Sequence, residues 1–104
     1  MHIISKALFS EAARSHPNHR RALQDLYRVL KRAEFENPEA MRRLFPSLDR
    51  FKFKQRWWVI DIAGNHMRLI AYVHFRQKRM YVKHIVTHAQ YDKLCWRYQK
   101  GDLR

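Results

Sequence analysis

Hydrophobic and polar residues alternate most regularly between residues 57 and 87, and this stretch predicts three β-strands joined by two tight turns. From Met67 to Phe75 every second side chain is apolar, which is the period of an antiparallel strand with one buried face. Gly64 and Asn65 stand just before this run as a two-residue hairpin signal. The sequence therefore predicts an antiparallel sheet, with strands over residues 56–62, 66–75 and 80–87.

The two turns predict which residues face each other across the sheet. Closing the first turn at Gly64 and Asn65 sets Asp61 opposite Arg68. A second turn over residues 76–79 is expected to pair Phe75 with Met80, which sets Leu69 opposite Val86. One face is then apolar, and the other collects polar side chains, namely Arg68, Tyr72, His74, Tyr81 and Lys83. We expect helices on the apolar face and function on the polar one.

Helical spacing precedes this sheet. Ile3 and Ile4 predict a short strand that extends it, and Ser5 is the expected N-cap of a helix over residues 6–15. A second helix is predicted over residues 18–33. Its apolar stripe has the i, i+3, i+4, i+7 spacing and consists of Leu23, Leu26, Tyr27 and Leu30. The arginines and lysines on the rest of this helix are interpreted as a solvated face.

Two further helix starts follow from capping signals. Asn37, Pro38 and Glu39 combine a cap, a proline at the first helical position and an acid in the first turn. Thr87 and Gln90 form a capping box that begins a short C-terminal helix. The buried positions of that helix are expected to be Tyr91, Leu94, Cys95 and Tyr98, and the chain from residue 96 is expected to fray. The predicted fold class is α+β, with residues 1–104 as a single domain.

The net charge of the chain is the compositional feature that indicates most about its binding partner. The 104 residues contain 22 lysines and arginines against 9 acids, which gives a net charge of +13. Of these, 13 bases but only 3 acids lie in residues 50–104, the half that contains the sheet. A polyanion, above all a nucleic acid, is the expected partner. One cysteine and no long apolar run predict a cytoplasmic chain without a disulfide or a membrane span.

Bases alternate with aromatic residues between residues 50 and 56. If this segment is a strand, alternation sends one set of side chains to the same side, and these are the candidate RNA-binding residues Arg50, Lys52, Lys54 and Arg56. The alternative is a basic edge strand that prevents aggregation. Seven histidines raise the question of a metal, but the pairs His16/His19 and His84/His88 lack cysteine partners and Asp92 is the only clustered acid nearby, so no metal or other cofactor is predicted.

The start of the C-terminal helix provides two further candidate catalytic residues. His88 is its first residue and Tyr91 follows one turn later, at a terminus whose amide groups and dipole favour anions. Tyr91 is also the first member of the buried stripe, so a ring that packs in the core is the alternative. His84 is expected to face the helices as a hydrogen-bonded core histidine, unless a β-bulge reverses its direction.

Several motifs, taken together and in order, resemble the HigB toxins of the RelE-like superfamily of type II toxin–antitoxin systems. They are Phe45-Pro46-Ser47-Leu48-Asp49, Phe51-Lys52, Gly64-Asn65, Arg68-Leu69-Ile70-Ala71 and Thr87-His88-Ala89-Gln90-Tyr91-Asp92. The resemblance covers nearly the whole chain. It implies a RelE-like fold and a ribosome-dependent mRNA endonuclease that needs no metal. It also implies a HigA-type helix-turn-helix antitoxin, through which alone operator DNA would be bound.

In such enzymes the ribose 2′-hydroxyl attacks the adjacent phosphate, which requires cations and proton-transfer groups. The polar face of the predicted sheet offers Arg68 as the phosphate clamp, with Lys83 as a further cation and Asp61 orienting the guanidinium. His88 or Tyr91 is the candidate proton-transfer group, and Lys52 and Lys54 position the message or stabilise charge. Whether a histidine or a lysine is the base stays open. The alternative is a basic α+β module that binds RNA or DNA without cutting it, and turnover separates the two.

Overall fold

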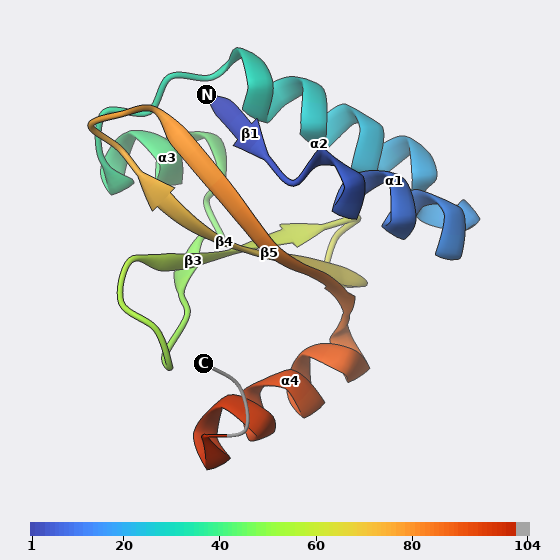
Figure 1. The fold of residues 1–104 in the computed structure, drawn as a ribbon. Coiled ribbons are helices and arrows are strands. Elements are labelled where there is room, and N and C mark those ends of the chain that lie inside the picture. Colours follow the sequence, from blue (N-terminus) through green and yellow to red (C-terminus); the bar gives the residue numbers. More distant parts are fainter. Residues whose placement is uncertain (102–104) are drawn as a thin grey trace.

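A five-stranded sheet separates two groups of helices in the computed structural model, which describes residues 1–101 (Figure 1). β1 pairs in parallel with β5, and the other neighbours are antiparallel. The α+β class is confirmed, with a mixed rather than purely antiparallel sheet. In sheet order the strands are β1 (His2–Ile4), β5 (Arg79–Thr87), β4 (Met67–His74), β3 (Trp57–Ile62) and β2 (Asp49–Arg50).

Helices cover both faces of this sheet. On one face lie α1 (Lys6–Ser15), a 3₁₀ turn (Pro17–His19) and α2 (Arg20–Arg32), and we call this the α1–α2 face. The predicted stripe of α2 packs there, with Leu23, Leu26 and Leu30 buried. The short helix α3 (Pro38–Leu44) adds Met41 to the same core. The opposite face carries α4 (His88–Lys100), and we call it the α4 face (Figure 1). Within residues 1–101, no helix combines the length and apolar character that crossing a bilayer demands.

The helix ends agree with most of the capping signals. The Asn37 side chain accepts a hydrogen bond from the Ala40 amide, and the Thr87–Gln90 capping box is complete. Ser5 is the N-cap residue of α1 as predicted, but its backbone is left-handed (φ 80°) and its side chain makes no capping hydrogen bond. α4 continues through residues 96–100 and ends at Gly101 (φ 82°), so fraying was wrong for those residues; residues 102–104 lie outside the described part.

The first hairpin has the predicted register and the second does not. Asp61 pairs with Arg68, as expected. In the second hairpin Val73 pairs with Met80 and Leu69 with Ile85, because the turn occupies residues 75–78 and a β-bulge interrupts the pairing between Ile70 and Ala71. The extra residue opposite this step is Lys83. Beyond it, each side chain of β5 points to the face opposite the predicted one.

The bulge reverses two side chains that matter for the site. His84 turns to the α4 face and contacts Tyr98, so its expected place among the N-terminal helices was wrong. Ile85, expected on the polar face, packs instead against the core of the α1–α2 face. The α4 face therefore receives His84 and Val86 in place of Ile85 and Thr87.

A second, smaller core lies under α4. Its buried members are Phe51, Val59, Ile70 and Leu94. Because Phe51 is drawn into this core, the chain leaves β2 after Arg50 and makes turns up to Arg56, which has φ 63°. The predicted strand over residues 50–56 was therefore wrong beyond Arg50, and so was the expectation that its bases all point one way.

Candidate active site

The guanidinium of Arg68 is held on three sides. Its Nε lies 3.5 Å from the Asp61 carboxylate, and its terminal nitrogen donates a hydrogen bond of 3.1 Å to Asn65 Oδ1. The ring of Tyr91 lies beneath it, 4.5 Å from the guanidinium carbon to the ring centroid. The Arg68 side chain is 20% exposed. A cation fixed in this way is positioned before any ligand arrives, which is what stabilisation of a developing phosphorane charge requires.

Asn65 helps to hold the Arg68 side chain, a role that was not predicted from the sequence. It was interpreted only as a turn residue, yet its side-chain oxygen faces Arg68 three positions later. Asn65 belongs to the turn between β3 and β4, and the correct register of that hairpin already placed it next to the start of β4. The sequence did contain a signal for this contact: a polar side chain stands on a turn, three residues before the arginine that was predicted to bind phosphate.

Tyr91 is a neutral phenol in this environment. Burial raises its pKa to about 12, and the neighbouring Cys95 side chain adds to the rise, while Arg68 opposes it. The hydroxyl therefore stays protonated at neutral pH. A hydroxyl that is protonated at neutral pH can serve there as a proton donor and not as the base, although the raised pKa makes it a weaker acid.

His88 is about half exposed at the first position of α4. Its Nδ1 lies 3.6 Å from the Asp92 carboxylate, one turn further along the helix. The His88 amide donates a hydrogen bond to the His66 carbonyl, and the Gln90 amide donates to the Thr87 hydroxyl. These bonds use amide groups that we expected to receive an anion, so the helix terminus is a weaker anion site than predicted.

The remaining predicted cations fall into two groups. Lys83 and Lys54 share the α4 face with Arg68: Lys83 lies 5.6 Å from the Trp57 ring, and Lys54 lies 5.9 Å from the Tyr98 ring. Lys52 is exposed in the turn beside them.

Arg50 lies over Trp58, which belongs to the core of the α1–α2 face, so it points away from Arg68. Arg56 stands just before β3, at the end of that strand opposite to Asp61.

His84 and Tyr98 hold the second half of α4 against the sheet. His84 Nε2 and the Tyr98 hydroxyl lie 2.9 Å apart, and the Tyr98 ring packs edge-on against Phe51 and Trp57. The predicted stripe of α4 contained Tyr98, but the stripe alone did not say which face of the sheet it covers. In the structure, Tyr98 covers the face on which Phe51 is buried.

We expect acid to weaken the fold through His84. Burial, followed by Lys83 and Arg97, lowers the pKa of His84 below its ordinary 6.5, so below that pH the unfolded chain binds a proton that the folded chain resists. The stabilisation is complete above about pH 6.5 and is lost as the pH falls toward the lower folded-state pKa. Urea unfolding between pH 7.5 and 5 measures it.

The His84→Gln variant is the control, since glutamine can still hydrogen-bond to Tyr98 and does not titrate. Its free energy of unfolding should depend less on pH than that of the parent chain over this range. Parallel curves for the two proteins would show that His84 contributes nothing to the pH dependence.

Within residues 1–101, no three histidine, cysteine or acidic side chains gather closely enough to form a metal site. The residues around Arg68 offer a positioned arginine, a neutral phenol, a partly exposed imidazole and nearby lysines. Cations around a phosphate together with two proton-transfer groups are the equipment for phosphoryl transfer.

Comparison with known proteins identifies the family of the chain. The family model HigB_toxin, described as the RelE-like toxic component of a toxin–antitoxin system, matches residues 19–94. The chain is 54% identical over 101 residues to the mRNA interferase HigB of Escherichia coli O6:H1, covering 97% of this chain and 98% of that protein. It is 34% identical over 92 residues to the mRNA interferase toxin HigB of E. coli K12 and to the HigB of Shigella flexneri, with 88% coverage of both chains in each case. The chain therefore belongs to the HigB family of RelE-like toxins.

Proposed function

We propose that this chain is a ribosome-dependent mRNA endoribonuclease that stops translation and is neutralised by a HigA-type antitoxin in the cytoplasm. The observation that carries the proposal is the fixed Arg68 guanidinium, stacked on Tyr91 one helical turn from His88. The names of the relatives, which are mRNA interferases, support mRNA as the substrate. Operator DNA would be bound only through the antitoxin.

The residues take the following roles in the proposed reaction. Arg68 binds the scissile phosphate, and Asp61 and Asn65 hold its guanidinium in place. His88 takes the proton of the ribose 2′-hydroxyl on Nε2, since its Nδ1 faces Asp92. The 2′-oxygen attacks phosphorus, the bond to the 5′-oxygen breaks, and Tyr91 gives that oxygen its proton. The products are a 2′,3′-cyclic phosphate and a 5′-hydroxyl.

Lysines and aromatic rings next to this centre suit the flanking nucleotides. Lys83 lies near the rings of Trp57 and Tyr81, and Lys54 lies near Tyr98, so charge and π-surface alternate across the α4 face. Phosphates and bases of a single strand are bound by this combination. Lys83 thus acts as a secondary cation, and Lys52 and Lys54 position the message.

The test is cleavage with and without translation. A message is incubated with purified protein, once with translating ribosomes and once without them, and new 5′ ends are mapped. We expect new ends in the first tube and none in the second, each with a 5′-hydroxyl. Equal cutting in both tubes would indicate a free ribonuclease. Tight RNA binding without cutting in either tube would indicate a binding module.

A further inference from the structure

A hollow at the end of β4 gathers aromatic and basic side chains that the proposed reaction does not use. Its volume is about 310 Å³, and pockets of this size bind small molecules. Four rings and two guanidinium groups line it, those of Trp58, Tyr72, His74, Phe75, Arg56 and Arg76. None of the described lining residues is acidic. We call this site the β4-end hollow.

The rings of the β4-end hollow come from both faces of the sheet. Tyr72 and His74 alternate with Val73 along β4 and lie on the α4 face. Trp58 and Phe75 pack with the core of the α1–α2 face. His74 and Phe75 are half-buried, so each remains partly accessible from the hollow. An unpaired base can stack on rings that are accessible in this way.

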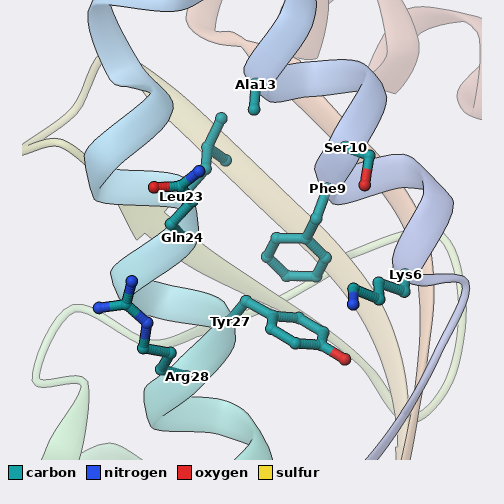
Figure 2. A pocket seen from close by; sticks show the side chains of 8 residues that line it. All are labelled: Lys6, Phe9, Ser10, Ala13, Leu23, Gln24, Tyr27 and Arg28. Atoms are coloured by element: carbon teal, nitrogen blue, oxygen red, sulfur yellow. The ribbon is translucent and has the colours of Figure 1, made fainter.

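The hollow between α1 and α2 offers no such rings (Figure 2). Phe9 is only 5% exposed there and packs against Tyr27 with ring centroids 5.2 Å apart, and Lys6 lies over the Tyr27 ring. The sheet also separates that hollow from Arg68, since α1 and α2 pack on the face opposite α4 (Figure 1). An RNA strand held at Arg68 therefore has no direct path to it along the α4 face.

The groups around the β4-end hollow complement an RNA strand. Arg56 and Arg76 are exposed lining residues, and the guanidinium carbon of Arg50 lies 5.5 Å from the centre of the Trp58 ring. His74 Nδ1 accepts a hydrogen bond of 3.1 Å from a backbone amide of the following turn. In the neutral imidazole Nε2 then carries the hydrogen and can donate it to a ligand. Rings beside cations bind single strands, because bases stack on the rings while phosphates pair with the cations.

A row of rings joins the hollow to the surface already proposed to contact the message. Trp57, Tyr72 and Tyr81 stand opposite one another on β3, β4 and β5, and Lys83 lies near the first and the last of them. The Tyr72 ring lies 6.5 Å from the His74 ring, between centroids. Tyr72 is four residues from Arg68 on β4, which corresponds to about 13 Å at the usual rise of a strand. An extended RNA strand covers this distance with a few nucleotides.

We propose that the β4-end hollow binds one base of the message, a few nucleotides away from the phosphate at Arg68. The inference rests on the proposed function and deepens it by adding a second, distal contact with the same RNA strand. The base stacks on His74 and Phe75, and Arg56 and Arg76 pair with the phosphates beside it. Arg56, expected from the sequence to bind RNA, thereby has a role although it lies at the end of β3 opposite to Asp61.

The experiment measures RNA binding without cleavage and without ribosomes. The protein is the full chain with Arg68→Ala, so that it can be produced. The probe is a fluorescent single-stranded RNA with 2′-fluoro groups, which cannot be cut by attack of a 2′-hydroxyl, and a duplex of the same sequence is titrated beside it. Vacant ribosomes, which carry no message, are titrated as a third ligand.

Two pairs of variants are compared in this background. His74→Asn removes the ring but keeps an oxygen that can accept the turn hydrogen bond, and His74→Phe keeps a ring. Arg56→Ala with Arg76→Ala removes the cations of the hollow. Its matched control is Arg14→Ala with Arg32→Ala, which removes two exposed arginines from α1 and α2.

We expect His74→Asn to bind the single strand at least about fivefold more weakly than His74→Phe, and the duplex equally well. The loss of Arg56 and Arg76 should lower the slope of log affinity against log salt by about 1.4 relative to its control, since each phosphate contact of a single strand contributes about 0.7. Thermal melts check the fold, and the arginine variant carries the test if His74→Asn does not fold.

Hollow variants that bind the single strand as their controls do would overturn the inference. If they lose affinity for vacant ribosomes alone, the inference is overturned in favour of ribosomal RNA as the occupant. These binding results are obtained whether or not the chain cleaves mRNA, so they are independent of the cleavage assay that tests the proposed function.

Discussion

Arg68→Ala should lower ribosome-dependent cleavage by roughly 10²- to 10³-fold, the usual loss on removing one group that stabilises transition-state charge. The arginine makes its contacts with Asp61, Asn65 and Tyr91 at the surface of the sheet rather than inside the main core. The variant should therefore fold, and its expression without antitoxin should no longer stop growth. Single-turnover cleavage of a message on stalled ribosomes measures the effect.

Two controls distinguish a positioned guanidinium from general positive charge. Arg68→Lys keeps the charge but cannot reproduce the planar contacts with Tyr91 and Asn65, so it should recover only a small part of the rate. Arg43→Ala removes an exposed arginine of α3 and should cleave like the parent chain. A folded Arg68→Ala protein with the parental rate would remove Arg68 from the mechanism.

Tyr91→Phe should lower cleavage by about 10²- to 10⁴-fold while leaving ribosome and message binding unchanged. Phenylalanine keeps the ring beneath Arg68 and loses only the hydroxyl, whose raised pKa of about 12 keeps it protonated as an acid. Tyr72→Phe is the matched control, because Tyr72 is a half-buried tyrosine on β4 that contacts Tyr81 instead of Arg68. The measurement is again single-turnover cleavage.

A substrate with sulfur in place of the 5′-bridging oxygen sharpens this test. A thiolate leaves without needing a proton, so the Tyr91→Phe defect should largely disappear on that substrate if the hydroxyl is the general acid. If the defect is the same on both substrates, Tyr91 acts through the position of Arg68. A parental rate on the natural message would leave Tyr91 as a packing residue, the alternative already indicated by its place in the α4 stripe.

Local patterns predicted most of the fold because each depends on residues close together in the chain. The Asn37 cap, the Thr87–Gln90 box and the first hairpin are decided within a few residues, and all three are present. The second hairpin depends on a bulge, and alternation alone carries no signal for an extra residue. The strand predicted after Arg50 failed because Phe51 has its partners in α4, some forty residues away.

In the candidate site, too, contacts between residues paired by a local hairpin were predicted, and contacts that depend on distant parts of the chain were not. Asp61 and Arg68 were predicted as neighbours because a hairpin places them opposite each other. Residues 50–56 were treated as one surface, but Arg50 and Lys54 lie on opposite faces of the sheet. The contact of His84 with Tyr98 required both the bulge and the docking of α4, and neither follows from spacing along the chain.

The bulge at Lys83 allows β5 to carry one residue more than regular pairing with β4 would use. Residues before it follow one alternation and residues after it follow the other. Deleting Lys83 would give regular pairing, with Val82 still opposite Ala71 and His84 still opposite Ile70, so His84 would keep facing α4. A relative with one residue fewer at this point of the strand can therefore present the same side chains on either side of the gap and lose only the lysine. A one-residue alignment gap here thus reports the loss of a cation, and a gap elsewhere in β5 reports a strand whose later side chains face the other way.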